Sequence, residues 1–215
     1  LLQSAEDAGV DIVVSAPVRE LVTKRARVTG VVADTEQGRR TYKARNGVVL
    51  AAGGFPNDIA RRKKYFPRTP AGVDHWTLAP KTANGAGITL GESVGGVLAR
   101  GESAGAWCPV SLVPYRNGKV GTFPHIMDRA KPGSIGVLST GKRFVNEANG
   151  YYDYVAAMFE HAPEGEPVQA WQIADSRFVR RFPLGMAKPL PVPLFPYLRS
   201  GYLVRGKTLG ELAHK

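Results

Sequence analysis

Side chains that can handle protons and charge are concentrated in the stretch GKRFVNEANGYYDYV, residues 141–155. Arg143 and Glu147 lie four positions apart, and Tyr151 and Tyr152 follow a short Asn-Gly turn. A tyrosine has an ordinary pKa near ~10, so it acts as a base only where a cation or hydrogen-bond donor stabilises its anion. The stretch also fits a structural interpretation, in which the charged pair holds the loop and the tyrosines pack at a helix start.

Five strand-like segments come first in the chain and must position a second group of residues. Alternating apolar residues and β-branched residues predict strands over residues 10–16, 18–24, 27–34, 40–44 and 46–54. The last contains VVLAA, a continuous apolar run that is typical of a strand covered on both faces. It ends in Gly53 and Gly54, where the backbone can turn sharply or approach a ligand without a Cβ in the way.

The remaining sequence predicts a mixture of short helices, strands and irregular segments. Residues 55–80 are basic and contain proline, as in a passage between domains. Thr208, with Glu211 three positions later, predicts a capped helix start. The other predicted elements are helices over 1–9, 57–65, 82–96 and 152–161, a short helix from Asp175, strands within 134–140 and 168–174, and an extended Pro-rich segment over 183–196.

Composition narrows the class of protein. The net charge of +11 admits an anionic partner. The basic residues are scattered, however, and only residues 61–64 form a run, so we expect no nucleic-acid partner. The single Cys108 excludes an internal disulfide and suits a reducing, cytoplasmic compartment. No apolar run reaches the ~18 residues of a membrane span, and the spacing around His75 and His125 does not predict a metal site.

Two segments resemble a known family. ARNGVVLAAGGFPND resembles the strand and turn beside the cofactor in flavoproteins of the fumarate reductase and succinate dehydrogenase superfamily, and GKRFVNE resembles the loop of their capping domain. KPGSIGVLSTGKRFVNEANGYYDYV and SGYLVRGKTLGELAHK are most similar to the 3-ketosteroid Δ1-dehydrogenase branch, where a tyrosine follows the Asn-Glu pair by a few residues.

The resemblance implies an α+β fold with FAD as cofactor. It predicts the β-rich part of an FAD-binding domain over residues 1–66, a flavoprotein capping domain over 67–205, and the start of another helix over 206–215. The family's G-x-G-x-x-G fingerprint is absent, and the chain opens at Leu1 without Met. We therefore expect an internal fragment that binds FAD weakly or not at all and is inactive by itself.

The resemblance also implies roles for individual residues. Val18 would meet the adenine, and Ala52, Gly53 and Gly54 would lie beside the cofactor. An acidic residue that relatives carry near the flavin is replaced by Ala86, which puts one cofactor contact in doubt.

The catalytic residues implied by the family are Tyr151, Glu147 and Arg143. The expected reaction is dehydrogenation of a CH–CH group in a small, hydrophobic, ketosteroid-like carbonyl compound, with hydride transfer to flavin. A fumarate or succinate oxidoreductase is the alternative enzyme, although residues 148–152 lack its relay arginine. A non-catalytic basic binding module is the alternative outside enzymes. Trp107 and Phe123 are candidates for a substrate pocket or for core packing.

Overall fold

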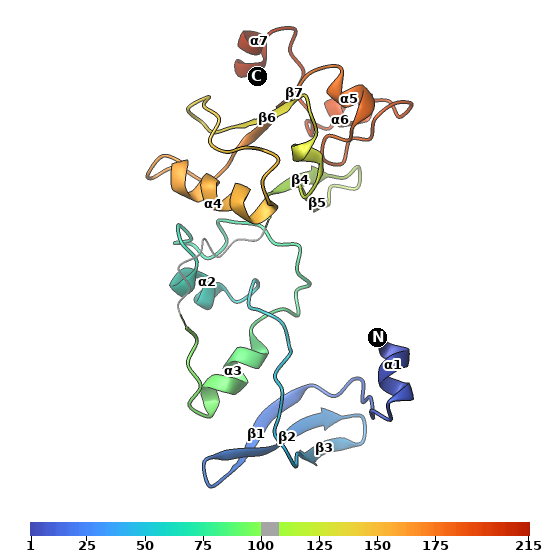
Figure 1. Cartoon of the computed structure of the whole chain (residues 1–215), viewed down its shortest axis with the longest axis vertical. Helices are drawn as coiled ribbons and strands as arrows, with labels where there is room; N and C mark the ends of the chain where they lie inside the picture. The colour runs from blue at the N-terminus through green and yellow to red at the C-terminus, as the bar shows by residue number, and fades with distance from the viewer. Residues whose placement is uncertain (100–107) are drawn as a thin grey trace. The chain divides into compact units, whose positions relative to one another are not determined.

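The computed structural model describes residues 1–99 and 108–215 and divides the chain into two compact units (Figure 1). Unit 1 comprises Leu1–Phe55 and Lys81–Ala99, and unit 2 comprises Pro56–Pro80 and Arg100–Lys215. Both units contain helices and strands, which confirms the mixed α and β composition predicted from the sequence.

A three-stranded antiparallel meander forms the centre of unit 1 (Figure 1). Its order is β1-β2-β3. At Gly30 of β2 a Cβ atom would lie 2.3 Å from the Tyr42 carbonyl oxygen of β3, so the pairing at this position requires glycine. The helices and strands of unit 1 are α1 (Leu2–Asp7), β1 (Val18–Lys24), β2 (Arg27–Thr35), β3 (Gly38–Lys43) and α3 (Ala86–Ser93).

The first and last of the five predicted strands do not form. Residues 10–16 and 46–54 contain no strand, and the VVLAA run is not buried, since the Val49 side chain is 91% exposed. A strand needs a hydrogen-bonding neighbour, and no strand of the described residues pairs with either segment. The prediction of a covered strand is therefore wrong for this chain, although the turn at Gly53 has the positive φ of +75° that favours glycine.

Unit 2 contains two separate antiparallel strand pairs, β4 with β5 and β6 with β7. The segment Pro56–Pro80 belongs to this unit, because Arg68 donates hydrogen bonds to the carbonyls of Ala162 (3.0 Å) and Pro163 (2.5 Å). The elements are α2 (Ile59–Tyr65), β4 (Val110–Pro114), β5 (Val120–Pro124), the 3-10 turn η1 (Asp128–Ala130), β6 (Ser134–Val137), α4 (Tyr151–His161), β7 (Trp171–Ala174), α5 (Phe178–Arg181), α6 (Phe195–Arg199) and α7 (Leu209–Ala213).

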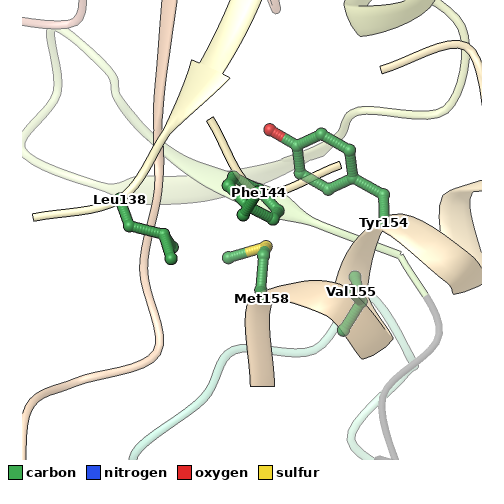
Figure 2. Close-up of a cluster of buried hydrophobic side chains, with 5 residues drawn as sticks. All are labelled: Leu138, Phe144, Tyr154, Val155 and Met158. Carbon is green, nitrogen blue, oxygen red and sulfur yellow. The ribbon is translucent and has the colours of Figure 1, made fainter. Parts of the chain in front are cut away.

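One hydrophobic cluster anchors α4 (Figure 2). Met158 shares a helix face with Tyr154 and Val155, which precede it by four and three positions, and all three pack against Leu138 and Phe144. The rings of Phe144 and Tyr154 meet edge to face with 5.0 Å between centroids. Because these side chains are buried, the start of α4 is fixed to the β6 region of unit 2.

Most of the predicted helices are confirmed. α1, α2 and α3 fall within the predicted ranges, and α4 begins one residue earlier than predicted, at Tyr151. Thr208 caps α7 through a 3.1 Å hydrogen bond that its hydroxyl accepts from the Glu211 N–H. The Pro-rich segment has no helix until α6 begins at Phe195. A proline in the first turn suits α6, because that turn needs no N–H donor there.

Candidate functional site

The Arg143–Glu147 pair forms as the sequence predicts. The Glu147 carboxylate is buried and accepts hydrogen bonds from Arg143 Nε (2.9 Å), a terminal nitrogen of Arg143 (2.5 Å) and the Gly136 N–H of β6 (3.0 Å). Arg143 reaches the carboxylate from outside, since its side chain is 55% exposed. The pair therefore ties the loop that precedes α4 to the edge of β6.

The environment of Glu147 keeps its carboxylate charged. Burial alone raises the pKa of the carboxyl group, but the hydrogen bonds from Arg143 and the Gly136 N–H outweigh burial and hold the pKa below the ordinary value. With three donors already directed at it, the Glu147 carboxylate acts as a fixed acceptor. This geometry supports the structural interpretation of the pair.

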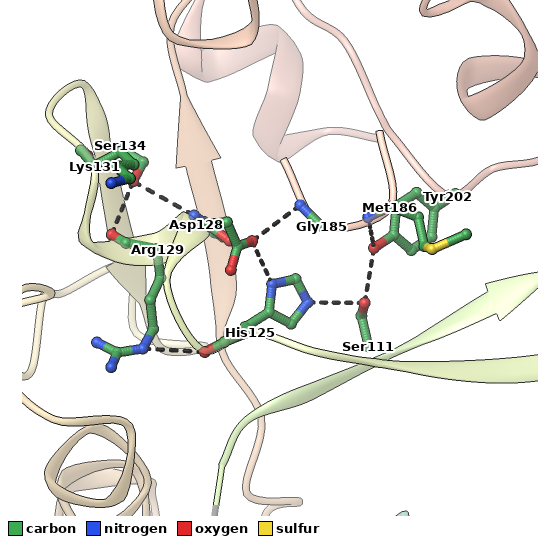
Figure 3. Close-up of polar contacts among 10 residues, drawn as sticks. Ser111, His125, Asp128, Arg129, Lys131, Ser134, Gly185, Met186 and Tyr202 are labelled. Atoms are coloured by element: carbon green, nitrogen blue, oxygen red, sulfur yellow. Dashed lines mark hydrogen bonds and ion pairs between the residues drawn. The ribbon is translucent and has the colours of Figure 1, made fainter. Parts of the chain in front are cut away.

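Arg129 is a second support of the same loop, and the sequence analysis missed it. Its side chain is buried and donates to three backbone carbonyls, those of Glu147, Asn149 (2.8 Å) and His125 (3.2 Å), the last of which is drawn in Figure 3. The guanidinium also lies over the Tyr154 ring at 4.9 Å. Since the bonded carbonyls are backbone groups, which every residue carries, no side-chain spacing could have revealed this role.

Tyr151 is the first residue of α4 and is half-buried. Two neighbouring tyrosines differ from Tyr151 in how far they are buried. Tyr152 is exposed, whereas Tyr154 is buried in the core, where burial, followed by the charge of Glu147, raises the pKa of its hydroxyl to about 12 despite the opposing charge of Arg129. Tyr154 therefore stays protonated at neutral pH.

In unit 1, the segment predicted to meet the cofactor is held at the start of α3. The Gly54 carbonyl accepts a hydrogen bond from the Gly85 N–H (3.1 Å), and a Cβ atom at Gly87 would lie 3.1 Å from the Ala52 methyl group. Around Gly53, no described atom lies within 4 Å of the position that a Cβ atom would take. Ala52, Gly53 and Gly54 are all exposed, so their backbone is open to close approach and fits a bound nucleotide.

Val18 begins β1 at the edge of the sheet, where it pairs with Ala33 and stays 37% exposed. Its contact with adenine stays a prediction. The first turn of α3 carries no acidic side chain, as Ala86 implies.

A large cleft of about 2380 Å³ lies within unit 2. Its wall includes Gly141 and Tyr154, whereas Tyr151, Glu147 and Arg143 are not part of the wall. Phe123 is not part of the wall either, and Trp107 lies outside the described residues. Cationic side chains outnumber anionic ones on the wall: Arg62, Arg129, Arg180, Arg205, Lys207 and Lys215 against Asp74 and Asp175.

A chain of hydrogen bonds also reaches this wall (Figure 3). His125 Nδ1 is 2.7 Å from Asp128 Oδ2, and His125 Nε2 is 2.8 Å from Ser111 Oγ. Ser111 Oγ is in turn 2.9 Å from the Tyr202 hydroxyl. The sequence analysis considered His125 only as a possible metal ligand and did not identify Asp128 as its partner. The spacing of His125 and Asp128, three positions apart on one turn, was the available signal.

The described residues offer neither a metal site nor a membrane-spanning helix. They contain no group of three or more His, Cys, Asp or Glu side chains placed to hold a metal ion. They also contain no helix with the length and hydropathy that crossing a membrane requires.

Residues 1–196 match the FAD binding domain family, and the chain belongs to that family. This membership confirms the flavoprotein resemblance and FAD as the cofactor of the protein that contains the chain. The chain is 40% identical over its whole length to 4-oxocyclohex-2-ene-1-carboxylate 5-dehydrogenase of Sinomonas cyclohexanicum, of which it covers 36%. It is 32% identical, over 97% of its length, to 3-oxosteroid 1-dehydrogenase of Mycolicibacterium smegmatis, of which it covers 37%.

Solved structures show the same likeness. The chain resembles the 3-ketosteroid delta1-dehydrogenase from Sterolibacterium denitrificans in complex with 1,4-androstadiene-3,17-dione, with a TM-score of 0.77 and 30% identity over 99% of the chain. It covers 38% of that structure. The match confirms the resemblance to the ketosteroid dehydrogenase branch, and the chain spans little more than a third of the length of each of these relatives.

Proposed function

We propose that the chain is part of an FAD-dependent dehydrogenase that removes hydrogen from a CH–CH group beside a ketone. The observation that carries this proposal is the structural likeness to a ketosteroid dehydrogenase over 99% of the chain, with a TM-score of 0.77. The named relatives, which are dehydrogenases of cyclic ketones, point to the same reaction class. A single reaction class thus accounts for the likeness in sequence and in fold.

We also propose a division of labour along the chain. Residues 1–66 would form part of the FAD-binding domain, residues 67–205 the capping domain, and residues 206–215 the start of a further helix. The compact units support a refinement, in which residues 56–66 join the capping part and residues 81–99 join the cofactor-binding part. The backbone at Gly53 is open, and the neighbouring Gly54 is hydrogen-bonded to the start of α3. Both features suit a role for unit 1 in facing the cofactor.

The reaction assigns separate tasks to the cofactor and to the protein. When bound, FAD supplies the acceptor for the hydride. The protein must supply the base that takes the proton from the carbon beside the ketone, and we assign this to the Tyr151 hydroxyl oxygen. Arg129 and the Glu147 carboxylate hold the loop before Tyr151 and so position its hydroxyl. Arg143 keeps Glu147 ionised and in place.

The substrate class follows from the relatives. Their names describe dehydrogenases of cyclic ketones, so we propose a small cyclic ketone with a hydrophobic body as the substrate. The name of the relative from Sinomonas cyclohexanicum describes a ring that carries both an oxo group and a carboxylate. Succinate is a poor candidate, because residues 148–152 lack the relay arginine of the fumarate reductases.

The complete FAD-loaded protein provides the test. It is mixed without oxygen with 4-oxocyclohexanecarboxylate, 4-androstene-3,17-dione or succinate, and flavin bleaching is followed by absorbance. We expect bleaching with at least one ketone and none with succinate. Bleaching by succinate alone, or by none of the three, would refute the proposal. Tyr152→Phe, which alters the exposed neighbour of Tyr151, is the matched control for Tyr151→Phe.

A further inference from the structure

The chain Tyr202–Ser111–His125–Asp128 joins segments that are far apart in the sequence, and it has the contacts of a built site (Figure 3). The Tyr202 oxygen accepts the Met186 N–H (3.0 Å), and Asp128 Oδ2 accepts the Gly185 N–H (2.9 Å). A Cβ atom at Gly185 would lie 2.0 Å from the Tyr202 oxygen, so only glycine lets this hydroxyl sit where it does. Tyr202, Ser111 and His125 all line the unit 2 cleft.

A hydrolase is the first function that a Ser-His-Asp arrangement suggests, but the surroundings do not support one. Acyl transfer needs N–H donors directed at the developing oxyanion. Here the nearby N–H groups of Gly185 and Met186 are already committed to Asp128 and Tyr202, and the Ser111 hydroxyl is bonded to Tyr202. The geometry instead suits a chain of hydrogen bonds in which the direction of donation can reverse.

Counting the hydrogens gives two arrangements. With neutral His125, the Tyr202 hydroxyl donates to Ser111, Ser111 donates to His125 Nε2, and His125 Nδ1 donates to Asp128, so the only hydroxyl hydrogen of Tyr202 is used. With protonated His125, Nε2 donates to Ser111 and Ser111 donates to Tyr202. The Tyr202 hydrogen is then free for an acceptor that enters the cleft.

The buried carboxylate of Asp128 lies directly against the imidazole of His125. Asp128 is buried, and its Oδ1 has no hydrogen-bond partner among the described residues, so the carboxylate charge is incompletely compensated. Burial raises the pKa of Asp128, but the hydrogen bond from His125 helps to hold the pKa below its ordinary value. Two more titratable groups are linked to His125: Arg129 donates to its backbone carbonyl, and Tyr202 reaches its imidazole through Ser111. The Phe123 ring packs against the imidazole edge to face.

We propose that Tyr202 binds the carboxylate of a ring-bearing acid in the unit 2 cleft, and that His125 takes up a proton through Ser111 when the acid binds. A carboxylate fits better than a ketone oxygen because the cleft wall carries more cationic than anionic side chains, including Arg205 and Lys207 close to Tyr202 in sequence. Binding an anion also favours the additional positive charge on the imidazole. The site is separate from Tyr151, which is not part of this wall.

Calorimetry of the complete FAD-loaded protein tests the proposal, with 4-oxocyclohexanecarboxylate, cyclohexanecarboxylate and cyclohexanone as probes. Each titration is made at one pH in phosphate and in Tris, whose ionisation enthalpies differ. We expect both acids to bind with an uptake approaching one proton, seen as a buffer-dependent enthalpy, and cyclohexanone to bind without it. Failure of both acids to bind, or a binding enthalpy independent of buffer, would overturn the proposal.

Two variants separate the roles of the hydrogen-bonded residues, and two others serve as controls. Tyr202→Phe should weaken the acids by about tenfold or more and abolish proton uptake. Ser111→Ala should leave much of the affinity but abolish uptake, because the link to His125 is cut. Tyr197→Phe, which changes a ring 6.2 Å from that of Tyr202, should behave like the unaltered protein. Unchanged uptake in Ser111→Ala would refute the relay, whereas a loss of cyclohexanone affinity alone in Tyr202→Phe would reassign the site to ketone oxygens. Tyr151→Phe should leave binding intact, so failure of this site is distinguishable from failure of the proposed reaction.

Discussion

The loop before α4 and the glycine segment before α3 are both predicted to face the reaction, yet the chain supports them very differently. The first loop is held on two sides, by Arg129 on its carbonyls and by the buried carboxylate of Glu147. The segment Ala52 to Gly54 is exposed and is held by one backbone bond and by packing on α3. The comparison indicates that the described chain fixes the loop before α4 through its own side chains, whereas it leaves the glycine segment open.

Replacing Tyr151 is expected to give the largest effect. Tyr151→Phe in the FAD-loaded protein should lower turnover by about 10²-fold to 10⁴-fold, because a positioned base typically contributes that much. FAD content should stay the same, since Tyr151 belongs to unit 2 and not to the glycine segment. Stopped-flow flavin reduction measures the first quantity and the flavin-to-protein absorbance ratio measures the second. Turnover within threefold of the unaltered protein would remove Tyr151 from the mechanism.

Replacing Arg129 is expected to give the next largest effect, a loss of stability. Arg129→Met removes the donor from the buried carbonyl of Glu147 and from two part-buried carbonyls, and should lower the free energy of unfolding by roughly 2 to 4 kcal/mol. Urea unfolding measures the change. Arg199→Met, at an exposed arginine of α6, should have little effect. Equal stability of the two variants would show that the loop does not depend on the Arg129 clamp.

The sequence predicts the elements that carry their own signals. α2 begins after Asp58, whose carboxylate accepts the Arg61 N–H (2.9 Å), and such an N-cap is readable from residue type and spacing. The Arg143–Glu147 pair is likewise readable, because its members are four positions apart. The strand over 46–54 was predicted from its apolar pattern, but a strand also needs neighbours, and the described chain supplies none.

Contacts between distant segments account for what the sequence could not predict. Ser111 and Tyr202 are 91 positions apart, and their hydrogen bond exists only because β4 and the segment after α6 meet in unit 2. The bonds of Arg129 end on backbone carbonyls, which every residue carries, so the amino-acid types hold no trace of them. The supports of the site were therefore less predictable than the residues that they support.

The pH dependence of stability tests whether the charge of Glu147 holds the loop before α4. Its folded-state pKa lies below the ordinary 4.5, so its stabilisation is fully present above that value and is lost as the pH falls through the folded-state pKa. Glu147→Gln should destabilise the protein by about 1 to 3 kcal/mol at pH 7, and the difference from the unaltered protein should narrow below about pH 4. Urea unfolding at both pH values measures it.

The other acidic groups titrate in both proteins, so their contributions cancel in this difference. Glu164→Gln, at an exposed carboxylate, is the control and should show no such pH dependence. A Glu147→Gln difference that stays constant from pH 7 to pH 3 would mean that the charge of Glu147 does not stabilise the loop.

The smallest expected effect concerns the glycine segment, where two matched variants test whether FAD lies beside Gly53. Gly53→Ala places a side chain on a residue with φ of +75°, and Gly9→Ala does the same at a φ of +74°; neither position has a described atom within 4 Å of the new Cβ. Both changes should cost about 1 to 2 kcal/mol of backbone strain. Only Gly53→Ala should also weaken FAD binding, because only there would the added methyl group meet the cofactor. Fluorescence titration of FAD into the flavin-stripped protein measures this difference. Equal FAD affinity of the two variants would place the cofactor away from Gly53 and would leave the segment as an ordinary turn against α3.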